Sequence, residues 1–173
     1  MRILVYEWCC SGGLAGRDAG GGASCAGLHA EGLAMFRAVL DDARRDPRFE
    51  VAAVVDASRP VTLPAGVHAS EVPVGAELAT LAVEAARAAM TIVVAPETDG
   101  LLAARVAAVR RAGGAALAPD AAFLEVAADK HATVLALATA GVPVPAGRLL
   151  PAGGEWPAEF ARPAVRKPCD GAG

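Results

Sequence analysis

The stretch Met90-Thr91-Ile92-Val93-Val94-Ala95 decides the fold class that this sequence predicts. It is a short run of apolar and β-branched residues, and Pro96-Glu97-Thr98-Asp99-Gly100 ends it at once. Runs of this length and composition are typical of strands that are buried on both faces, as in parallel sheets. We therefore predict that this stretch is a central strand of a parallel sheet.

Strand and helix patterns alternate on both sides of this stretch. The predicted strands are short and apolar, and the predicted helices space their apolar residues three or four apart. Such alternation favours crossover connections and an α/β fold with a Rossmann-like parallel sheet. The expected elements are strands at 2–6, 49–55, 67–72, 90–95 and 115–118, separated by helices at 28–45, 76–89 and 101–112.

The alternating pattern ends near residue 118. Two short helix patterns follow, beginning at Pro119-Asp120 and at Asp129-Lys130, and weaker strand patterns come after them at 144–149 and 165–167. This change of pattern indicates a domain boundary. The expected organisation is a Rossmann-like domain at 1–118 and the opening of a second domain at 119–173.

The composition excludes several classes of protein. Of the 173 residues 54% are hydrophobic and 20% are charged, and the net charge is −3, so the chain can bury a core and is not disordered on composition. It carries no basic stripe, which argues against a nucleic-acid partner. No stretch reaches the roughly 18 apolar residues of a membrane span, and Glu7 interrupts the apolar start. We therefore expect a cytoplasmic protein with no membrane partner.

The four cysteines stand at positions 9, 10, 25 and 169. They form no CxxC pair, and no histidine lies at a zinc-binding spacing from them. We expect free thiols in a reducing compartment and assign no metal ligand.

Lys130 and Lys167 are the candidate phosphate-binding residues. A lysine near a helix start is unfavourable by about 0.3–1 kcal/mol unless an anion compensates, and a phosphate would do so. Lys167 precedes Pro168-Cys169-Asp170-Gly171-Ala172-Gly173, where glycines let backbone N–H groups approach an anion closely. Asp129 is the expected N-cap of the helix that Lys130 begins.

A second group of candidates lies where predicted strands end. Ser11-Gly12-Gly13 follows the first strand, and Glu97 and Asp99 follow the strand at 90–95. Ligands of open α/β sheets bind beyond the carboxyl ends of the strands, so these residues are candidates for binding a substrate and its ammonium group. Two alternatives stay open. The glycine loop can be a plain surface loop, and Asp99 can be the N-cap of the next helix, which is the role we favour for it.

Lys130 at a helix start and Lys167 before Asp170-Gly171-Ala172-Gly173 together resemble the ATP-grasp superfamily. Members of that family have a Rossmann-like "pre-ATP-grasp" domain followed by two subdomains that clamp ATP. The resemblance covers the whole chain and implies a Rossmann-like pre-ATP-grasp domain at 1–118, followed by an incomplete, truncated α+β ATP-grasp subdomain at 119–173. It implies an ATP site and a substrate site. The ATP-binding residues would be Lys130, Lys167, Asp170, Gly171 and Gly173, and the substrate-binding residues Ser11, Gly12, Gly13, Glu97 and Asp99.

Three further stretches narrow the resemblance: Leu4-Val5-Tyr6-Glu7-Trp8 with Ser11-Gly12-Gly13-Leu14, Glu31-Gly32-Leu33-Ala34-Met35, and Ala95-Pro96-Glu97-Thr98-Asp99-Gly100. They are similar to the branch that includes the tyramine–glutamate ligases of methanofuran biosynthesis. The family reaction activates a carboxylate as an acylphosphate, with ATP and Mg²⁺, for attack by an amine. The resemblance therefore implies a carboxylate–amine ligase acting on glutamate or a similar amino acid.

The Mg²⁺ ligands of the family lie in its second subdomain, which has no counterpart in this sequence. We therefore assign no catalytic residue, and we expect the chain to be inactive alone and to self-associate through an exposed apolar surface. The alternative is a non-catalytic Rossmann-like module that binds a ligand or a partner chain. A third hypothesis is an NAD-dependent oxidoreductase with Asp56 on a ribose, although no G-x-G-x-x-G fingerprint is present.

Overall fold

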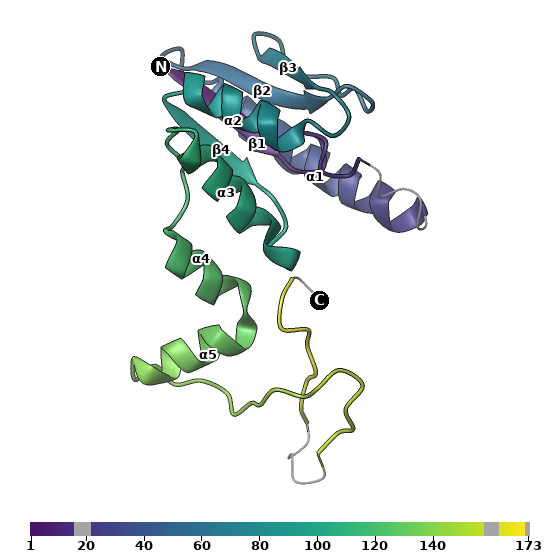
Figure 1. Cartoon of the computed structure of the whole chain (residues 1–173), viewed down its shortest axis with the longest axis vertical. Helices are drawn as coiled ribbons and strands as arrows, with labels where there is room; N and C mark the ends of the chain where they lie inside the picture. Colours follow the sequence, from purple (N-terminus) through teal and green to yellow (C-terminus); the bar gives the residue numbers. More distant parts are fainter. Residues whose placement is uncertain (16–21, 158–162, 172–173) are drawn as a thin grey trace.

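A parallel sheet forms the centre of the computed structural model, which describes residues 1–15, 22–157 and 163–171 (Figure 1). Its strands lie in the order β3-β2-β1-β4, and all neighbouring pairs are parallel. They are β1 (Arg2–Glu7), β2 (Glu50–Asp56), β3 (His68–Val72) and β4 (Met90–Val94). The four longer strands predicted from the sequence are confirmed.

The strand expected at 115–118 is reduced to a single bridge beside β4. The backbone N–H of Thr91 donates to the carbonyl of Ala115 at 2.7 Å, and the N–H of Leu117 donates to the carbonyl of Thr91 at 2.9 Å. With this bridge the order becomes 3-2-1-4-5, which is the order of the Rossmann fold.

Helices cover the sheet on both faces. Alternate residues of β1 enter the two layers, with Ile3 and Val5 on the side of α1 and Leu4 and Tyr6 on the side of α2 and α3. Burial on both sides explains why β1 and β2 are almost continuously apolar, whereas the edge strand β3 is largely exposed and polar. The helices around the sheet are α1 (Gly22–Ala43), α2 (Glu77–Arg87) and α3 (Leu101–Arg111), and a short 3-10 turn, η2 (Thr98–Gly100), precedes α3. The fold is therefore the predicted α/β fold with a Rossmann-like sheet.

The chain after the sheet forms a helix pair that points away from it (Figure 1). These helices are α4 (Ala121–Ala128) and α5 (Lys130–Thr139). Leu124 is the buried residue of α4, and no residue is buried in α5. Large apolar side chains are consequently exposed along this part of the chain: Phe123, Val126, Leu135, Leu137, Val142, Leu149 and Val165.

The strands predicted at 144–149 and 165–167 are wrong, because both stretches are extended chain without sheet pairing. Pro145 and Gly147 interrupt the first stretch, and Pro168 follows the second. A strand also needs a partner, and no described strand lies beside either stretch to pair with it.

Two findings bear on the expectations from composition. The four cysteines carry free thiols, as predicted. Among the helices that the structure describes, none is both long enough and apolar enough to cross a membrane.

At Gly32 the helix α1 packs closely against the turn that follows β1. A Cβ at this position would lie 2.6 Å from Oε1 of Glu7 and 2.8 Å from Cβ of Cys9. Glu7 cannot move aside, because it is buried and its carboxylate accepts the backbone N–H groups of Cys9 and Cys10. Glycine therefore lets α1 lie directly on the turn that follows β1.

We predict that Gly32→Ala lowers the free energy of unfolding by about 1–3 kcal/mol, the usual cost of overpacking. Gly27→Ala on the same helix is the matched control, because nothing lies within 4 Å of the added Cβ. There the gain in helix propensity should stabilise the protein by about 0.5–1 kcal/mol. Urea denaturation of both variants measures the difference, and equal effects would contradict the packing argument.

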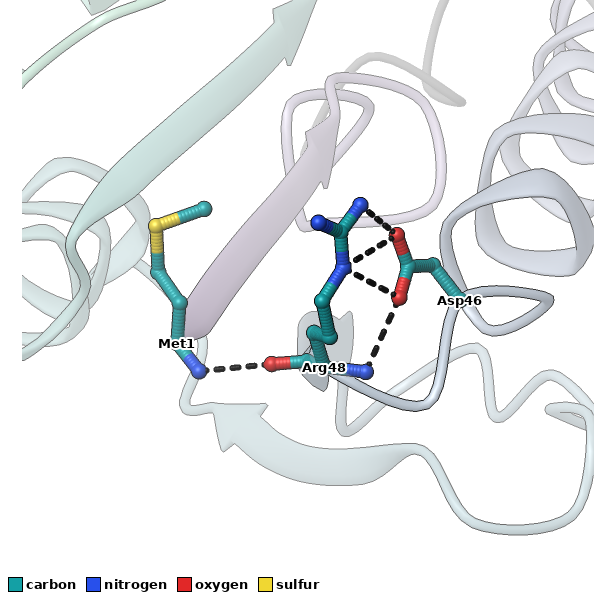
Figure 2. Close-up of polar contacts among 3 residues, drawn as sticks. All are labelled: Met1, Asp46 and Arg48. Atoms are coloured by element: carbon teal, nitrogen blue, oxygen red, sulfur yellow. Dashed lines mark hydrogen bonds and ion pairs between the residues drawn. The ribbon is translucent and has the colours of Figure 1, made fainter.

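An exposed ion pair fixes the turn before β2, at the end of the sheet where β1 and β2 begin (Figure 2). Nε of Arg48 donates to both carboxylate oxygens of Asp46 at 2.9 Å, and the backbone N–H of Arg48 donates at 3.0 Å. The amino group of Met1 donates to the carbonyl of Arg48 at 2.7 Å, which ties this turn to the start of β1. The hydrogen bonds from Arg48 lower the pKa of Asp46 to about 2.

We predict that the carboxyl group of Asp46 titrates near pH 2 in the folded protein, against about 3.9 for a free aspartate. Because the folded pKa is the lower one, its stabilising contribution is complete above the unfolded pKa and is lost as the pH falls towards 2. NMR titration measures the midpoint. Arg48→Gln should raise it, whereas Arg45→Gln, which removes a partner of Asp42, should not. A midpoint near 3.9 in the unmodified chain would contradict the prediction.

Candidate functional site

The carboxyl ends of β1 and β4 lie side by side in the middle of the sheet. The backbone N–H of Trp8 donates to the carbonyl of Val94 at 2.9 Å and joins them. The chain leaves β1 towards β2 and leaves β4 towards the bridge at Ala116, so the connections diverge from this point. Such a topological switch point is where open α/β sheets bind ligands, and it defines the candidate site.

The chain after β1 is a compact turn whose polar groups bond to one another. The N–H of Ser11 donates to the carbonyl of Glu7 and the N–H of Gly13 to the carbonyl of Trp8, both at 2.9 Å. The hydroxyl of Ser11 donates to the carbonyl of Val54 at 2.6 Å. Ser11 and Gly12 are buried. The interpretation as a plain surface loop is therefore wrong, and the Ser11 hydroxyl already has its acceptor within the chain.

The carboxylate of Glu7 is folded back onto the backbone of this turn. It accepts the N–H of Cys9 at 3.2 Å and of Cys10 at 2.8 Å. Burial and the charge of Glu7 raise the pKa of the Cys9 thiol to about 12, and the same causes raise the pKa of Cys10. Both thiols are therefore protonated at neutral pH and are not nucleophiles.

A buried polar cluster lies on the α2–α3 side of β1. The hydroxyl of Tyr6 donates to the carboxylate of Glu77, and Arg105 donates to the same carboxylate through Nε at 2.9 Å and Nη2 at 2.7 Å. Burial, followed by the charge of Glu77, raises the pKa of Tyr6. Burial is the largest influence on Arg105 and acts to lower its pKa, but the hydrogen bonds and charges of Glu77 and Tyr6 together outweigh it, so the pKa is raised. The cluster holds the start of α2 and the middle of α3 against β1.

No local sequence pattern reveals this cluster. Its members come from three elements, and the hydrogen-bonded partners are 71 and 28 residues apart in the sequence. Asp56 is likewise committed to the fold. It is buried, and its Oδ1 accepts the N–H and the hydroxyl of Ser58 at 2.8 and 2.7 Å. This position does not favour the ribose contact of the third hypothesis.

Glu97 and Asp99 are exposed directly after β4. The capping role favoured for Asp99 is wrong, because Gly100 is the N-cap of α3 and no side chain bonds there. Asp99 has a φ of 55° instead, in the left-handed region that aspartate enters more readily than most residues. Its backbone N–H donates to Oδ2 of Asp170 at 3.4 Å, which brings the residues near 170 to the turn η2.

Lys130 begins α5, and Asp129 is its N-cap as predicted. The carboxylate of Asp129 accepts the N–H of His131 at 2.7 Å and of Ala132 at 2.9 Å. The hydrogen bond from Ala132 is the main cause that lowers the pKa of Asp129. Lys130 itself contacts the residues before and at Gly171: its N–H donates to the carbonyl of Cys169 at 2.8 Å, and its Nζ donates to the carbonyl of Gly171.

The structure thus brings part of the predicted ATP site together. Lys130, Asp170 and Gly171 meet beside η2, near the start of α3 (Figure 1). Lys167 is exposed in the extended chain, and it makes no hydrogen bond or ion pair with any residue that the structure describes. Gly173 lies outside the described residues.

An ammonium group beside a glycine-containing loop is chemically suited to a phosphate, so the residues around Lys130 fit a nucleotide phosphate. Magnesium is different. Within residues 1–15, 22–157 and 163–171, no three His, Cys, Asp or Glu side chains are grouped so that they could hold a metal ion. These residues do not by themselves fit Mg²⁺.

Comparison with known protein families finds a match for one part of the chain. Residues 49–122 match the family model of the pre ATP-grasp 3 domain, a range that runs from the start of β2 into α4 and includes η2 and α3. This match supports membership of the ATP-grasp superfamily. No curated protein and no solved structure is significantly similar to the chain.

We predict that Arg105→Met lowers the free energy of unfolding by about 3 kcal/mol, because it leaves the buried carboxylate of Glu77 without its partner. This cost lies at the low end of the range for breaking a buried ion pair, because the Arg105 and Glu77 side chains are still 10% and 15% exposed. Arg111→Met, at an exposed position of the same helix, is the control and should change little.

A double-mutant cycle tests whether the two side chains act as a pair. Arg105→Met combined with Glu77→Leu should cost less than the sum of the two single substitutions, because the double variant buries no unpaired charge. Strictly additive costs in urea denaturation would show that the pair is not coupled.

Proposed function

We propose that this chain is the N-terminal portion of an ATP-grasp ligase, which activates a carboxylate as an acylphosphate for attack by an amine. Its pre-ATP-grasp domain would occupy residues 1–118 and the start of its ATP-grasp domain residues 119–173. The observation that carries the proposal is the pre ATP-grasp match at 49–122, with Lys130 held against Gly171 just beyond the matched residues.

The ATP side of the proposed site lies around Lys130. An ammonium group is a compact point charge suited to phosphate oxygens, and Lys130 lies in contact with a loop that contains a glycine at a φ of 69°. Such a loop can turn its N–H groups towards an anion. We assign phosphate contacts to Lys130 and Lys167, and we assign Asp170, Gly171 and Gly173 to the loop over the phosphates.

The substrate side lies at the switch point. Glu97 and Asp99 are exposed there and carry the charge that a substrate ammonium group requires. The turn with Ser11, Gly12 and Gly13 would form the wall of this site through its backbone, since the Ser11 hydroxyl is already bonded. We propose glutamate or a similar amino acid as the substrate, in line with the resemblance to the tyramine–glutamate ligase branch.

The residues assigned to the site would act by positioning the substrate carboxylate and the phosphate and by neutralising phosphate charge. Holding the carboxylate and the γ-phosphate in line removes the entropic cost of their encounter, and Lys130 offsets the charge that gathers on the phosphate. Mg²⁺, which the family uses together with ATP, would offset the remaining charge when bound. No step is assigned to it here, because the described residues do not group into a metal site.

We predict that the chain binds ATP measurably. The substitutions Lys130→Gln and Lys167→Gln should each weaken ATP binding. Loss of a charge-assisted phosphate contact should raise the Kd about tenfold or more, and isothermal titration calorimetry measures it. Arg166→Gln is the matched control: it removes a charge from an exposed neighbour of Lys167 and should leave the Kd unchanged within about twofold.

Two outcomes would contradict the proposal. If the folded chain binds no ATP, the non-catalytic Rossmann-like module becomes the better hypothesis. If the control weakens binding as much as the two lysine variants do, the interaction is general charge attraction and not a site built around Lys130.

A further inference from the structure

The two edges of β4 are used differently, because successive residues of a strand turn their N–H and C=O groups to opposite edges. The carbonyl of Val94 faces β1, where it accepts the N–H of Trp8 at 2.9 Å. Both backbone groups of Thr91 face the outer edge, where the bridge to residues 115–117 pairs them. Val93, two residues after Thr91, therefore also faces the outer edge.

The bridge does not continue along the edge to Val93. Leu117 donates its N–H to Thr91, so the next donor in a regular strand would be Pro119, and proline has no N–H. Arg110 also holds the turn that follows the bridge, since its Nη2 donates to the carbonyls of Ala118 and Pro119 at 2.9 and 2.8 Å. In the described part of the chain, no group pairs with the N–H or the C=O of Val93 on this edge.

The outer edge at Val93 belongs to the candidate site. In Figure 1, β4 is the last strand on its side of the sheet, and the next residue, Val94, joins β1 at the switch point. Val93 is half-buried. Backbone groups that are taken from water nearly always have a hydrogen-bond partner, so this edge is suited to a ligand that brings one acceptor and one donor.

An α-amino acid carries this pair of groups at the right spacing. In an antiparallel sheet, two residues that lie opposite each other exchange both backbone hydrogen bonds. A free amino acid can take the place of one of them, with its ammonium donating to the C=O of Val93 and its carboxylate accepting the N–H. Each of these bonds has one charged partner, which makes it stronger than a bond between two neutral groups.

The charges nearby select this antiparallel direction. It places the ammonium of the amino acid towards the carboxyl end of β4, where Glu97 and Asp99 are exposed, and the carboxylate towards the bridge at Thr91. The parallel direction would bring the carboxylate next to Glu97, and like charges repel. A longer peptide is less suited to this edge, because β4 ends at Val94 and the carbonyl of Pro96 already accepts the N–H of Leu102 at 3.0 Å.

We propose that an α-amino acid binds the outer edge of β4 by pairing its ammonium and carboxylate groups with the C=O and N–H of Val93. This inference deepens the proposed function and rests on it for the side chain of the amino acid, which we take to be that of glutamate. The ammonium has three hydrogens, so it can contact the Val93 carbonyl and the Glu97 carboxylate together.

Hydrogen exchange of the backbone amides, followed by NMR, tests the proposal on the unmodified chain. Without a ligand, the N–H of Val93 should exchange about tenfold or more faster than the N–H of Thr91, which donates to Ala115 at 2.7 Å. L-glutamate at about 10 mM should slow the exchange of Val93 about tenfold if its Kd is about 1 mM, because only the unbound fraction exchanges. Glutarate lacks the ammonium and 4-aminobutyrate lacks the α-carboxylate, so each should slow it about twofold at most.

A pair of variants tests the direction of the amino acid. Glu97→Gln should raise the Kd for L-glutamate about threefold or more, because it removes the charge beside the ammonium. Glu125→Gln, at an exposed position of α4, is the matched control and should leave the Kd unchanged. Equal effects of the two variants would overturn the proposed direction.

The other outcomes separate this site from the proposed function. Exchange of Val93 as slow as that of Thr91 in the ligand-free chain would overturn the unpaired edge. Equal slowing by L-glutamate and glutarate, or no slowing by L-glutamate with or without ATP, would overturn the amino-acid site even if the chain binds ATP. Slowing by L-glutamate alone, in a chain that does not bind ATP, would support the amino-acid site and overturn the proposed ligase.

Discussion

Burial of β1 on both faces is the constraint on which the rest of this structure depends. Its residues from Ile3 to Glu7 are all buried between β2, β4 and the covering helices, and two of them, Tyr6 and Glu7, are polar. A buried polar group must be hydrogen-bonded within the protein. Glu7 therefore shapes the turn after β1 around its carboxylate, and Tyr6 joins Glu77 and Arg105 between the two helices. The close approach of α1 at Gly32 follows from the first arrangement.

The same constraint separates the part of the switch point that is fixed from the part that can bind. On the β1 side, the side chains of Tyr6, Glu7 and Ser11 are hydrogen-bonded within the chain. On the β4 side, Glu97 and Asp99 are exposed, and Lys130 and residues 169–171 approach η2 from later in the chain. The contacts on this second side are fewer and more exposed, so they can rearrange around a ligand. The charged groups of the proposed ligase site are therefore assigned to residues outside the core, and the buried turn after β1 would contribute only its backbone.

Most of the sheet was predictable from the sequence because β1, β2 and β4 are short, mainly apolar runs, each ended by turn residues. The N-cap at Asp129 was also predictable from local sequence, because an aspartate directly before a helical pattern is a preferred capping residue. Prediction failed where an element depends on partners distant in sequence: the strand pattern at 144–149 finds no neighbour, and the cluster at Tyr6 joins residues of three elements. At Asp99 the local preference of aspartate for the N-cap points to the wrong residue, because the following Gly100 takes the cap position of α3. Lys130 was singled out by its unfavourable place at a helix start, but its contact with Gly171 has no sequence signal.

The proposed function requires that an anionic ligand binds beyond the carboxyl ends of β1 and β4, next to the start of α5. The most direct measurement is the change in backbone amide NMR signals during titration with ATP. We expect the largest changes on Thr98 and Asp99, on Lys130 to Ala132, and on residues 169–171. Signal changes confined to the amino ends of the strands, around Asp46 and Arg48, would contradict this binding site. The absence of changes at any ATP concentration would also contradict it.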